Sequence, residues 1–485
     1  MAYRIESIEL FVRETPPGRM AFSLGKQGGT GAARQGLKSP LGHVRMVVSD
    51  ASGATAFGCA ADRLSVRWLD KRPGRNLDLK RRELVALIQS AREIYLNQPE
   101  FETSFAQWRL CHPRIMRLGK SRGQEDLTSS FASALMERAL VDAVCRLEQT
   151  SVFEMVKHDR LGFQPAKLHP ELADLRFADT IAQTPRTSFF IRHTVGTSDP
   201  LKASDLNEEA RVGDGLPETL EEYIQADGVR FFKVKISGDV HRDLSRLADV
   251  WQVVLQADTP AITLDANEAY ADLTLFAEFV RLFERELAGL FQHTLYIEQP
   301  LPRHLAFDAQ SAAAIRRIAA QKPLLIDESD GTVDAFSRAL AGGYQGTSHK
   351  NCKGFFKSLA NHALAARMVQ RGTAAFLSGE DLQNLPVVPL HQDFATLGIL
   401  GLQHCERNGH HYNYGLSLLS PEDKQNTVRH HGDLYVRRGD EWFLNVTNGR
   451  VECASLQCPG FGIRDEPDWN SMTDMQTWVR KAHPA

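Results

Sequence analysis

The sequence predicts an α/β protein whose central part is a closed barrel of parallel strands. From about residue 188, short runs rich in β-branched and aromatic residues alternate with helical stretches, at intervals of roughly 20 to 40 residues. This alternation is typical of parallel βαβ units. Eight strand candidates follow one another, which favours a closed barrel over an open sheet.

The predicted barrel elements follow in chain order. The strand candidates are Phe189–Val195, Phe231–Ile236, Ala261–Ala266, Thr294–Glu298, Leu324–Asp327, Gly346–Lys350, Thr373–Ser378 and Thr396–Leu402. The helix candidates between them are Val240–Ala257, Leu273–Leu287, Ser311–Ala320, Asp334–Ala341 and Phe356–Gln370. Each strand candidate is short and each helix candidate has apolar residues at helical spacing.

The regions on either side of the barrel have a different pattern. Strands are expected at Ile5 to Val12, Gly42 to Val48 and Ala56 to Cys59, and helices at Leu77 to Leu96 and Ser130 to Leu147. The glycine-rich stretch 25–36 lacks the third glycine of a dinucleotide fingerprint and the Walker spacing, so we expect a loop there. After about residue 405 a loop-rich tail holds short β segments, which we expect to pack on the N-terminal region.

Composition excludes several classes of function. The 485 residues suggest two structural bodies, and a net charge of -3 argues against a nucleic-acid or anionic-membrane partner. No apolar run reaches the length of about 18 residues that a transmembrane helix needs. The first residues lack the pattern of a signal peptide, and seven cysteines without a CxxC pair favour reduced thiols. We therefore expect a cytoplasmic protein.

Polar residues end five successive strand candidates, where a barrel of this kind has its active site. They are Lys233 and Lys235, Asp265 and Asn267, Glu298, Asp327 and Glu328, and Lys350. Each motif alone is typical of a turn, a helix cap or a solvated strand end. Their occurrence in order, at successive strand ends, favours a functional site.

Three of these residues predict a metal site. Asp265, Glu298 and Asp327 would repel one another in a half-buried mouth, and a divalent cation removes that conflict. Ligands that are all oxygens favour Mg²⁺, with Mn²⁺ as the second choice. Lys235 and Lys350, on either side, are suited to act as general bases. A lysine base beside Mg²⁺ is an established arrangement of the enolase superfamily, so this pattern matches known chemistry.

The same motifs resemble the mandelate racemase and muconate lactonizing enzyme family of the enolase superfamily. Lys233-Val234-Lys235 resembles its KxK motif, Asp265, Glu298 and Asp327 its metal ligands, and Lys350 its sixth-strand lysine. The resemblance runs from about residue 130 to 465. It implies a modified (β/α)7β barrel at residues 136–405, under an α+β capping domain formed by residues 1–135 and the returning segment 406–485.

The resemblance also implies a reaction. We expect Mg²⁺-dependent removal of the α-proton of a small carboxylate substrate through a metal-stabilised enolate. Lysine on both faces favours the muconate lactonizing type of site and permits racemisation or epimerisation, cycloisomerisation or β-elimination. The alternatives are an acid-sugar dehydratase, which the lack of a seventh-strand histidine disfavours, and a metal-binding barrel without catalysis. Capping-domain faces in such families often associate, so a homo-oligomer is one option.

Further residues are candidates for substrate binding or for support of the metal site. They are Lys233, Asn267, Glu328, Glu380 and His404. Lys353 is the fallback if Lys350 is not the second base. The cluster at His404, His410 and His411 has no zinc spacing that the sequence supports, so loop packing is the expectation, with His404 kept as a substrate contact.

Overall fold

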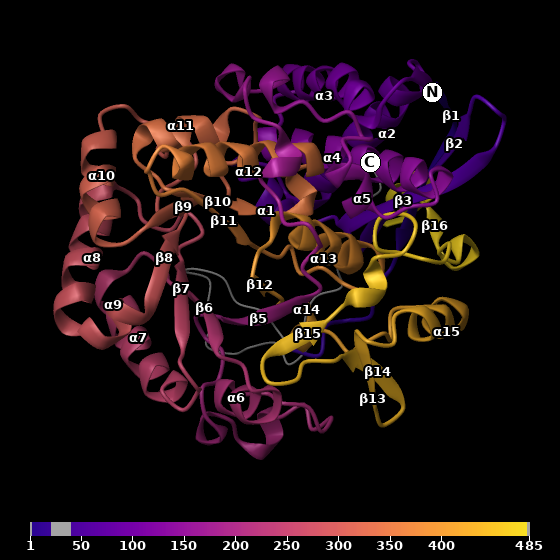
Figure 1. The fold of residues 1–485 in the computed structure, drawn as a ribbon. Coiled ribbons are helices and arrows are strands. Elements are labelled where there is room, and N and C mark those ends of the chain that lie inside the picture. The colour runs from indigo at the N-terminus through magenta and orange to yellow at the C-terminus, as the bar shows by residue number, and fades with distance from the viewer. Residues whose placement is uncertain (1, 21–39, 483–485) are drawn as a thin grey trace.

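A computed structural model describes residues 2–20 and 40–482, and its N-terminal part is a capping domain built on an antiparallel sheet (Figure 1). The strands are β1 (Tyr3–Arg13), β2 (Leu41–Asp50), β3 (Thr55–Arg63), β4 (Glu100–Phe101) and β16 (Thr473–Asp474), in the order β16-β1-β2-β3 with β4 also on β1. Much of β1 alternates buried and exposed residues, as a strand with one face on the core does. The predicted glycine-rich loop at 25–36 lies outside the described residues.

Three long helices cover this sheet, and their starts follow from the sequence. They are α2 (Leu77–Leu96), α3 (Ser104–Ser121) and α4 (Asp126–Leu147), preceded by the four-residue α1 (Val66–Leu69). The Asn76 and Thr103 side chains cap α2 and α3 by accepting hydrogen bonds from backbone N–H groups in the first turn. Helix α4 is buried along almost its whole length because it lies between the cap and the barrel.

A glycine permits the closest approach between α4 and the cap sheet. A Cβ at Gly58 of β3 would lie 2.1 Å from the Ala139 carbonyl oxygen and 2.3 Å from the Ala143 backbone nitrogen. Any side chain at this position would therefore push the helix away from the sheet.

Glu137 on α4 gives a first prediction. Its carboxyl group is buried; Oε1 accepts a 2.5 Å hydrogen bond from the Phe356 N–H, and Oε2 has no partner among the described residues. Burial raises the pKa of Glu137 to about 8. The unfolded chain therefore ionises first as the pH rises, so this group's contribution to stability is lost between its unfolded pKa and about 8.

We expect Glu137→Gln, which does not titrate, to unfold at higher urea than wild type at pH 9. The gain should be on the order of a few kcal/mol at pH 9 and shrink toward pH 5. Urea midpoints at both pH values measure it, with the exposed Glu93→Gln on α2 as control. An equal shift at both pH values would show that ionisation of Glu137 is not the cause.

The central sheet is a closed barrel of eight parallel strands, which confirms the predicted fold class. In chain order these are β5 (Ser188–Val195), β6 (Phe231–Lys235), β7 (Ala261–Asp265), β8 (Thr294–Glu298), β9 (Leu324–Ile326), β10 (Gly346–His349), β11 (Phe376–Gly379) and β12 (His404–Glu406). Neighbours in sequence pair in register, and β12 pairs with β5 to close the ring. The short β15 (Arg450–Glu452) adds to β5 in antiparallel fashion.

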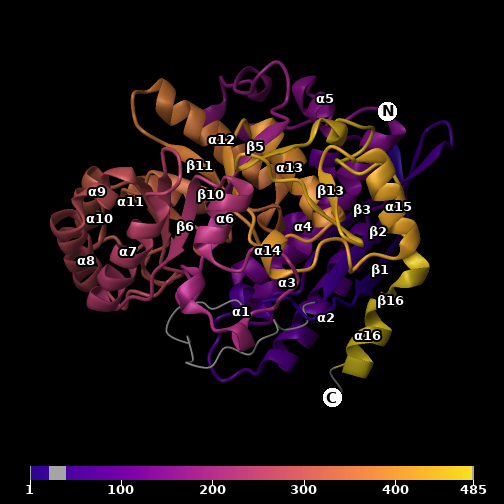
Figure 2. The same cartoon turned by 90° about the horizontal axis from the view of Figure 1, so that it is seen from below.

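Helices surround this ring (Figures 1 and 2). They are α6 (Leu220–Asp227), α7 (Val240–Val254), α8 (Leu273–Glu286), α9 (Ala288–His293), α10 (Ala312–Gln321), α11 (Ala335–Gly342), α12 (Phe355–Gln370) and α13 (Val388–Leu400), after α5 (Val152–Lys157) between cap and barrel. The outer helices α7 and α8 are amphipathic, with their apolar side chains buried toward the strands.

The predicted eighth strand is wrong. Thr396–Leu402 overlaps the end of helix α13, and the last barrel strand is β12, which begins at His404. The segment misled because α13 is buried on every side, so the apolar residues near its end are not interrupted by the polar positions of an exposed helix face. A short apolar run of this kind does not distinguish a buried strand from a buried helix.

The C-terminal segment returns to the cap, as predicted. It contains α14 (Gly409–Tyr412), α15 (Pro421–His430), the hairpin β13 (Tyr435–Arg438) and β14 (Glu441–Leu444), and α16 (Met475–Ala482). Between them β16 pairs with β1, so the two ends of the chain share one sheet. A continuous apolar core joins cap and barrel, and both Met475 and Trp478 of α16 belong to it.

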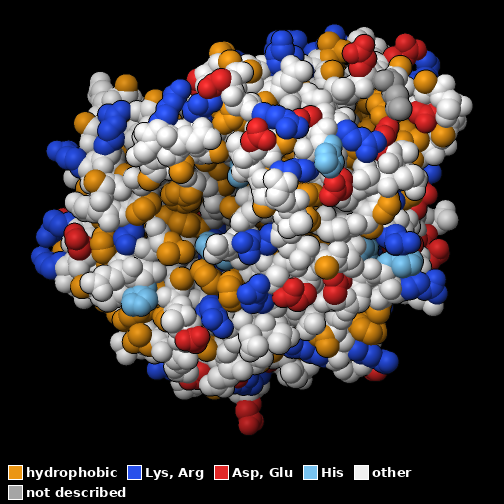
Figure 3. Space-filling view, viewed as in Figure 1, with side chains coloured by type: hydrophobic (Ala, Val, Ile, Leu, Met, Phe, Trp, Pro, Cys, Tyr) orange, Lys and Arg blue, Asp and Glu red, His pale blue; other side chains and the backbone are white. Residues whose placement is uncertain are grey.

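The surface and the thiols agree with the composition. None of the helices in the described part of the chain has the length and apolar character that crossing a bilayer needs. All seven cysteines are buried and free. On the face drawn in Figure 3, basic and acidic side chains are interspersed and no patch of a single sign dominates.

Candidate active site

Five charged residues meet at the carboxyl-terminal rim of the barrel. Lys235, Asp265 and Glu298 are the last residues of β6, β7 and β8, and they pair in register as direct neighbours. Asp327 and Lys350 follow β9 and β10 by one residue each. All five side chains are buried, so the site is closed in by its surroundings.

Lys233 lies at the centre of this group and contacts four carboxylates. Its Nζ is 2.9 Å from Asp265, 2.8 Å from Glu298, 2.5 Å from Glu380 and 3.0 Å from Glu406. Burial alone lowers the pKa of Lys233, but these carboxylates, Asp265 first, raise it well above its ordinary value. Lys233 is therefore a fixed positive charge, which holds the acidic groups together.

The two other lysines each contact one carboxylate. Lys235 Nζ lies 2.5 Å from Asp265 Oδ2, and Lys350 Nζ lies 2.7 Å from Asp327 Oδ2. Lys350 also lies over the ring of Trp68, 4.5 Å from its centroid. Burial lowers the pKa of Lys350, and the charge of Asp327 more than offsets this and raises it. Neither lysine is held by as many carboxylates as Lys233.

Glu298 shows that the carboxylate group fits a cation. Its Oε2 lies 2.8 Å from Lys233 without hydrogen-bond geometry, and Oε1 has no partner among the described residues. Burial and the neighbouring Asp265 and Glu380 raise the pKa of Glu298 well above its ordinary value. A buried carboxylate with free lone pairs among like charges is stabilised by a positive ion. An oxygen-only set with Asp265 and Asp327 suits Mg²⁺.

Three side chains contact the carboxylate of Asp327, namely Ser348, Lys350 and Lys353. Ser348 Oγ donates a 2.5 Å hydrogen bond to its Oδ1, and Lys353 Nζ lies 3.3 Å from the same atom. Burial raises the pKa of Asp327, but Lys350 and then Lys353 lower it well below its ordinary value. Lys353 also lies 3.2 Å from Asp330, so it belongs to the framework under the site.

The cap reaches the rim through one tryptophan. Trp68 Nε1 donates a 3.1 Å hydrogen bond to Glu328 Oε1, and Asn267 Nδ2 donates a 3.0 Å bond to the same oxygen. Burial and the adjacent Asp327 raise the pKa of Glu328 to about 7. Asn267 and Glu328 thus lie beside the carboxylates, while Trp68 was missed because nothing in the segment around it marks it as polar or catalytic.

The interior of the barrel holds two further charged residues, Arg192 and Glu406. Arg192 of β5 forms an ion pair with Glu380, and Thr194 Oγ1 donates a 2.6 Å hydrogen bond to Glu406. Of the two carboxylates, Glu380 and Glu406, the sequence predicts only Glu380 as a site residue. Glu406 ends the true eighth strand, and the incorrect eighth strand placed its end four residues too early. Correct placement of β12 would have identified Glu406.

His404 does not lie at the rim. It begins β12, two residues before Glu406, and its ring stacks on Phe231 at 4.6 Å. Its Nδ1 lies 2.8 Å from Arg192 Nη1, and burial with this guanidinium lowers the pKa of His404 to about 3. A neutral ring in a lower layer of the barrel has no route to a substrate at the mouth, so we leave it out of the proposed substrate contacts.

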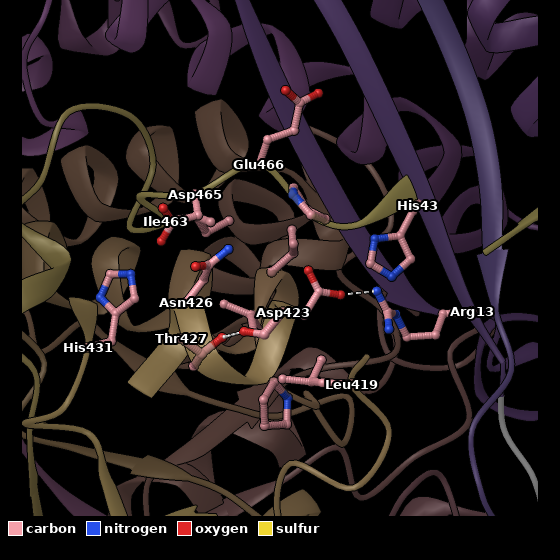
Figure 4. A pocket seen from close by; sticks show the side chains of 14 residues that line it. Arg13, His43, Leu419, Asp423, Asn426, Thr427, His431, Ile463, Asp465 and Glu466 are labelled. Atoms are coloured by element: carbon pink, nitrogen blue, oxygen red, sulfur yellow. Dashed lines mark hydrogen bonds and ion pairs between the residues drawn. The ribbon is translucent and has the colours of Figure 1, made fainter. Parts of the chain in front are cut away.

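A crevice elsewhere in the molecule is separate from this chemistry (Figure 4). It lies between the cap sheet and the C-terminal segment, where Arg13 Nη2 contacts Asp423 Oδ2 at 2.5 Å and His43 and Ile463 form part of the wall. None of the rim carboxylates or lysines lines it.

Comparisons with known proteins agree with this geometry. Residues 215–369 match the family model described as enolase C-terminal domain-like. A search of curated proteins finds no match. The barrel segment that matches contains Lys233, Lys235, all three rim carboxylates and Lys350.

Three solved structures share the whole architecture. An enolase from Streptomyces coelicolor is 14% identical, with a TM-score of 0.60 and coverage of 99% of both chains. A mandelate racemase/muconate lactonizing enzyme from Bordetella bronchiseptica is 16% identical, with a TM-score of 0.57 and coverage of 99% of this chain and 100% of that one. An enolase from Bradyrhizobium, solved with magnesium and mandelic acid, is 15% identical, with a TM-score of 0.57 and coverage of 97% and 98%.

At these identities the solved structures show a common fold, and the family model covers residues 215–369 of the barrel. The chain therefore shares the fold of these enolases and of mandelate racemase/muconate lactonizing enzymes, and its residues 215–369 are similar to the enolase C-terminal domain.

Proposed function

We propose that the protein removes the α-proton of a small carboxylate substrate, with Mg²⁺ bound at the barrel rim and Lys235 and Lys350 as the acid and base. The observation that carries this proposal is the placement of the two lysines. Lys235 ends β6 and Lys350 comes directly after β10. These two strands are four positions apart in a ring of eight, so the two lysines stand on opposite walls of the barrel. The carboxylates of β7, β8 and β9 lie between them.

The three lysines have different roles in this proposal. Lys233, held by four carboxylates, stays protonated and keeps the acidic groups in place. Lys235 and Lys350 each face one carboxylate, so each can exchange a proton with a substrate carbon between the walls. Burial excludes water from the site and strengthens the charge interactions there.

Asp265, Glu298 and Asp327 would hold the metal, Mg²⁺ before Mn²⁺. When bound, the ion polarises the substrate carboxylate and stabilises the negative charge that develops as the proton leaves. Lys235 and Lys350 stand beside these carboxylates, so a cation bound there would favour proton loss from their ammonium groups and provide a neutral base.

The lysine pair supports the muconate lactonizing type of site over a histidine-dependent one. Glu380, which follows β11, occupies the seventh-strand position, and its carboxylate contacts Lys233 and Arg192. With lysine on both walls, a racemase or epimerase uses one to take the proton and the other to return it. A cycloisomerase or a β-eliminating lyase needs only one. That the Bradyrhizobium enolase was solved with mandelic acid supports a small carboxylate as the substrate class.

Exchange of the α-proton in D₂O tests this function. The protein, loaded with Mg²⁺, is incubated with amino acids, dipeptides, sugar acids and aromatic hydroxy acids, and deuterium incorporation is followed by NMR. We expect exchange into members of one class and none after chelation. A protein that binds Mg²⁺ stoichiometrically yet exchanges no compound would favour a barrel without catalysis.

A further inference from the structure

Three histidines gather outside the barrel wall, away from the carboxylates of the rim. His193 belongs to β5, and His410 and His411 belong to α14, which follows the last strand, β12. One ring nitrogen from each lies within 4.8 Å of the other two. On β5, Thr194 points into the barrel toward Glu406, so His193 beside it points to the outer side.

The ring nitrogens of this cluster lack partners. His193 Nδ1, His410 Nε2 and both nitrogens of His411 are buried and accept or donate no hydrogen bond among the described residues. His193 and His411 are only 4% and 3% exposed. Buried polar atoms without partners are costly and rare in native proteins, so four in one cluster need an explanation.

The tautomer of one ring favours a metal. His410 Nδ1 contacts the Arg407 carbonyl oxygen, which accepts only, so Nδ1 carries the proton and Nε2 has a free lone pair. Metal-binding histidines commonly use their second nitrogen in this way. Burial lowers the pKa of all three histidines below the ordinary value, which keeps the rings neutral as ligands require.

The charged groups around the three histidines are paired with one another, so they would repel a bound cation only weakly. Arg19 Nη1 contacts the His411 carbonyl oxygen at 3.1 Å and the Tyr223 hydroxyl at 3.2 Å, but the Arg19 guanidinium is paired with Asp214 at 2.7 Å. Arg407 is likewise paired, with Asp393 at 2.6 Å. Near His410, the positive charge of Arg438 is paired with Asp227 at 3.4 Å. Nearby positive charge is therefore largely neutralised.

Aromatic packing accounts for the burial of the rings but not for their free nitrogens. His193 stacks on His411, with centroids 4.3 Å apart and planes 30° apart, and lies 4.4 Å from the Tyr223 ring. A tetrahedral ion with nitrogens at about 2.0–2.1 Å needs them about 3.3 Å apart. One of the two stacked rings must therefore turn to present its lone pair.

We propose that His193, His410 and His411 bind a transition-metal ion, Zn²⁺ in the first instance, at a site distinct from the magnesium carboxylates. Three neutral imidazoles suit Zn²⁺, with a water molecule in the fourth position, and do not suit Mg²⁺. The ion ties the first barrel strand to the segment after the last one. It therefore stabilises the seam where the barrel closes.

The test uses the full chain without a histidine tag, stripped by a chelator and held in excess Mg²⁺ to occupy the carboxylates. One equivalent of Zn²⁺ is added, and retained metal after desalting and the thermal midpoint are measured. We expect about one Zn²⁺ per chain and a raised midpoint. Loss of a supporting partner of a ligand already costs about 10–100-fold in affinity, so His410→Ala and His193→Ala should lose at least as much.

Two controls separate this site from others. His43→Gln changes a buried histidine whose ring nitrogens also have no hydrogen-bond partner in the described part of the chain, but which lies in the cap strand β2. This variant should keep the Zn²⁺. Glu298→Gln impairs the carboxylate site and should keep it as well. For variants that fail to fold, Co²⁺ bound to the wild-type chain should show the absorption bands of tetrahedral nitrogen ligation.

Three results would overturn the proposal. They are no Zn²⁺ retained by wild type, Zn²⁺ retained equally by the histidine variants, and Zn²⁺ lost in Glu298→Gln but kept in His410→Ala. In the last case the ion sits on the rim carboxylates. None of these outcomes bears on the proposed proton abstraction, which rests on other residues.

Discussion

Replacing Lys235 by alanine should lower the rate of α-proton exchange by about 10²–10⁴-fold, the usual contribution of a positioned general base. The chain should still bind Mg²⁺, because Asp265 keeps its contact with Lys233 at 2.9 Å. Exchange in D₂O, measured beside Mg²⁺ binding by calorimetry, separates the two effects. Lys350→Ala should abolish racemisation of a substrate whose two enantiomers interconvert, since the second wall then has no acid.

Lys322→Ala is the matched control for this prediction. Its ammonium is also largely buried and donates hydrogen bonds to the Phe291 and Thr294 carbonyl oxygens, at 2.6 and 2.7 Å, at the opposite end of the barrel. It should exchange substrate protons at the wild-type rate once folded. Exchange that survives both Lys235→Ala and Lys350→Ala would show that neither lysine is the base.

Replacing Glu298 by glutamine should stabilise the protein without metal and abolish its stabilisation by Mg²⁺. The pKa of Glu298 is raised in the folded state, so above its unfolded pKa this carboxyl group costs stability that glutamine does not. Replacing a buried carboxyl group that accepts no hydrogen bond among the described residues should gain on the order of 1–3 kcal/mol. The difference from wild type should shrink as the pH falls and vanish below the unfolded pKa, where the carboxyl group is protonated in both states. Thermal midpoints with and without Mg²⁺ measure both effects.

Glu328→Gln provides the comparison for Glu298. Its carboxyl group is equally buried and its pKa is raised to about 7, yet it faces Trp68 and Asn267. This variant should also gain stability without metal, but should keep the shift that Mg²⁺ causes. A Glu298→Gln protein that Mg²⁺ stabilises as much as wild type would exclude Glu298 as a ligand.

Sequence reasoning located the middle of the barrel well because local signals coincide there. Strands β6 to β9 each pair a short, mainly apolar run with a polar residue at or just after its end, such as Asp265 or Glu298. Only the eighth strand failed, because helix α13 is buried on all sides and the true strand is only three residues long. That error also concealed Glu406.

The composition of the site was predicted less completely than its position. The period-two spacing of Lys233 and Lys235 placed both on one face, but could not show that four carboxylates converge on Lys233. Contacts of this kind depend on strands that are far apart in sequence. Trp68 is a further example, since it reaches Glu328 across 260 residues from the cap.

The dependence of α-proton exchange on Mg²⁺ tests the central claim most directly. With the best substrate from the D₂O screen, the exchange rate of stripped wild-type protein is measured as Mg²⁺ is added, beside Glu298→Gln. We predict a saturable rise from a negligible rate in wild type, and little rise in the variant at the same concentrations. A rate that is independent of Mg²⁺, or a wild-type response in Glu298→Gln, would contradict proton abstraction at a metal site formed by Asp265, Glu298 and Asp327.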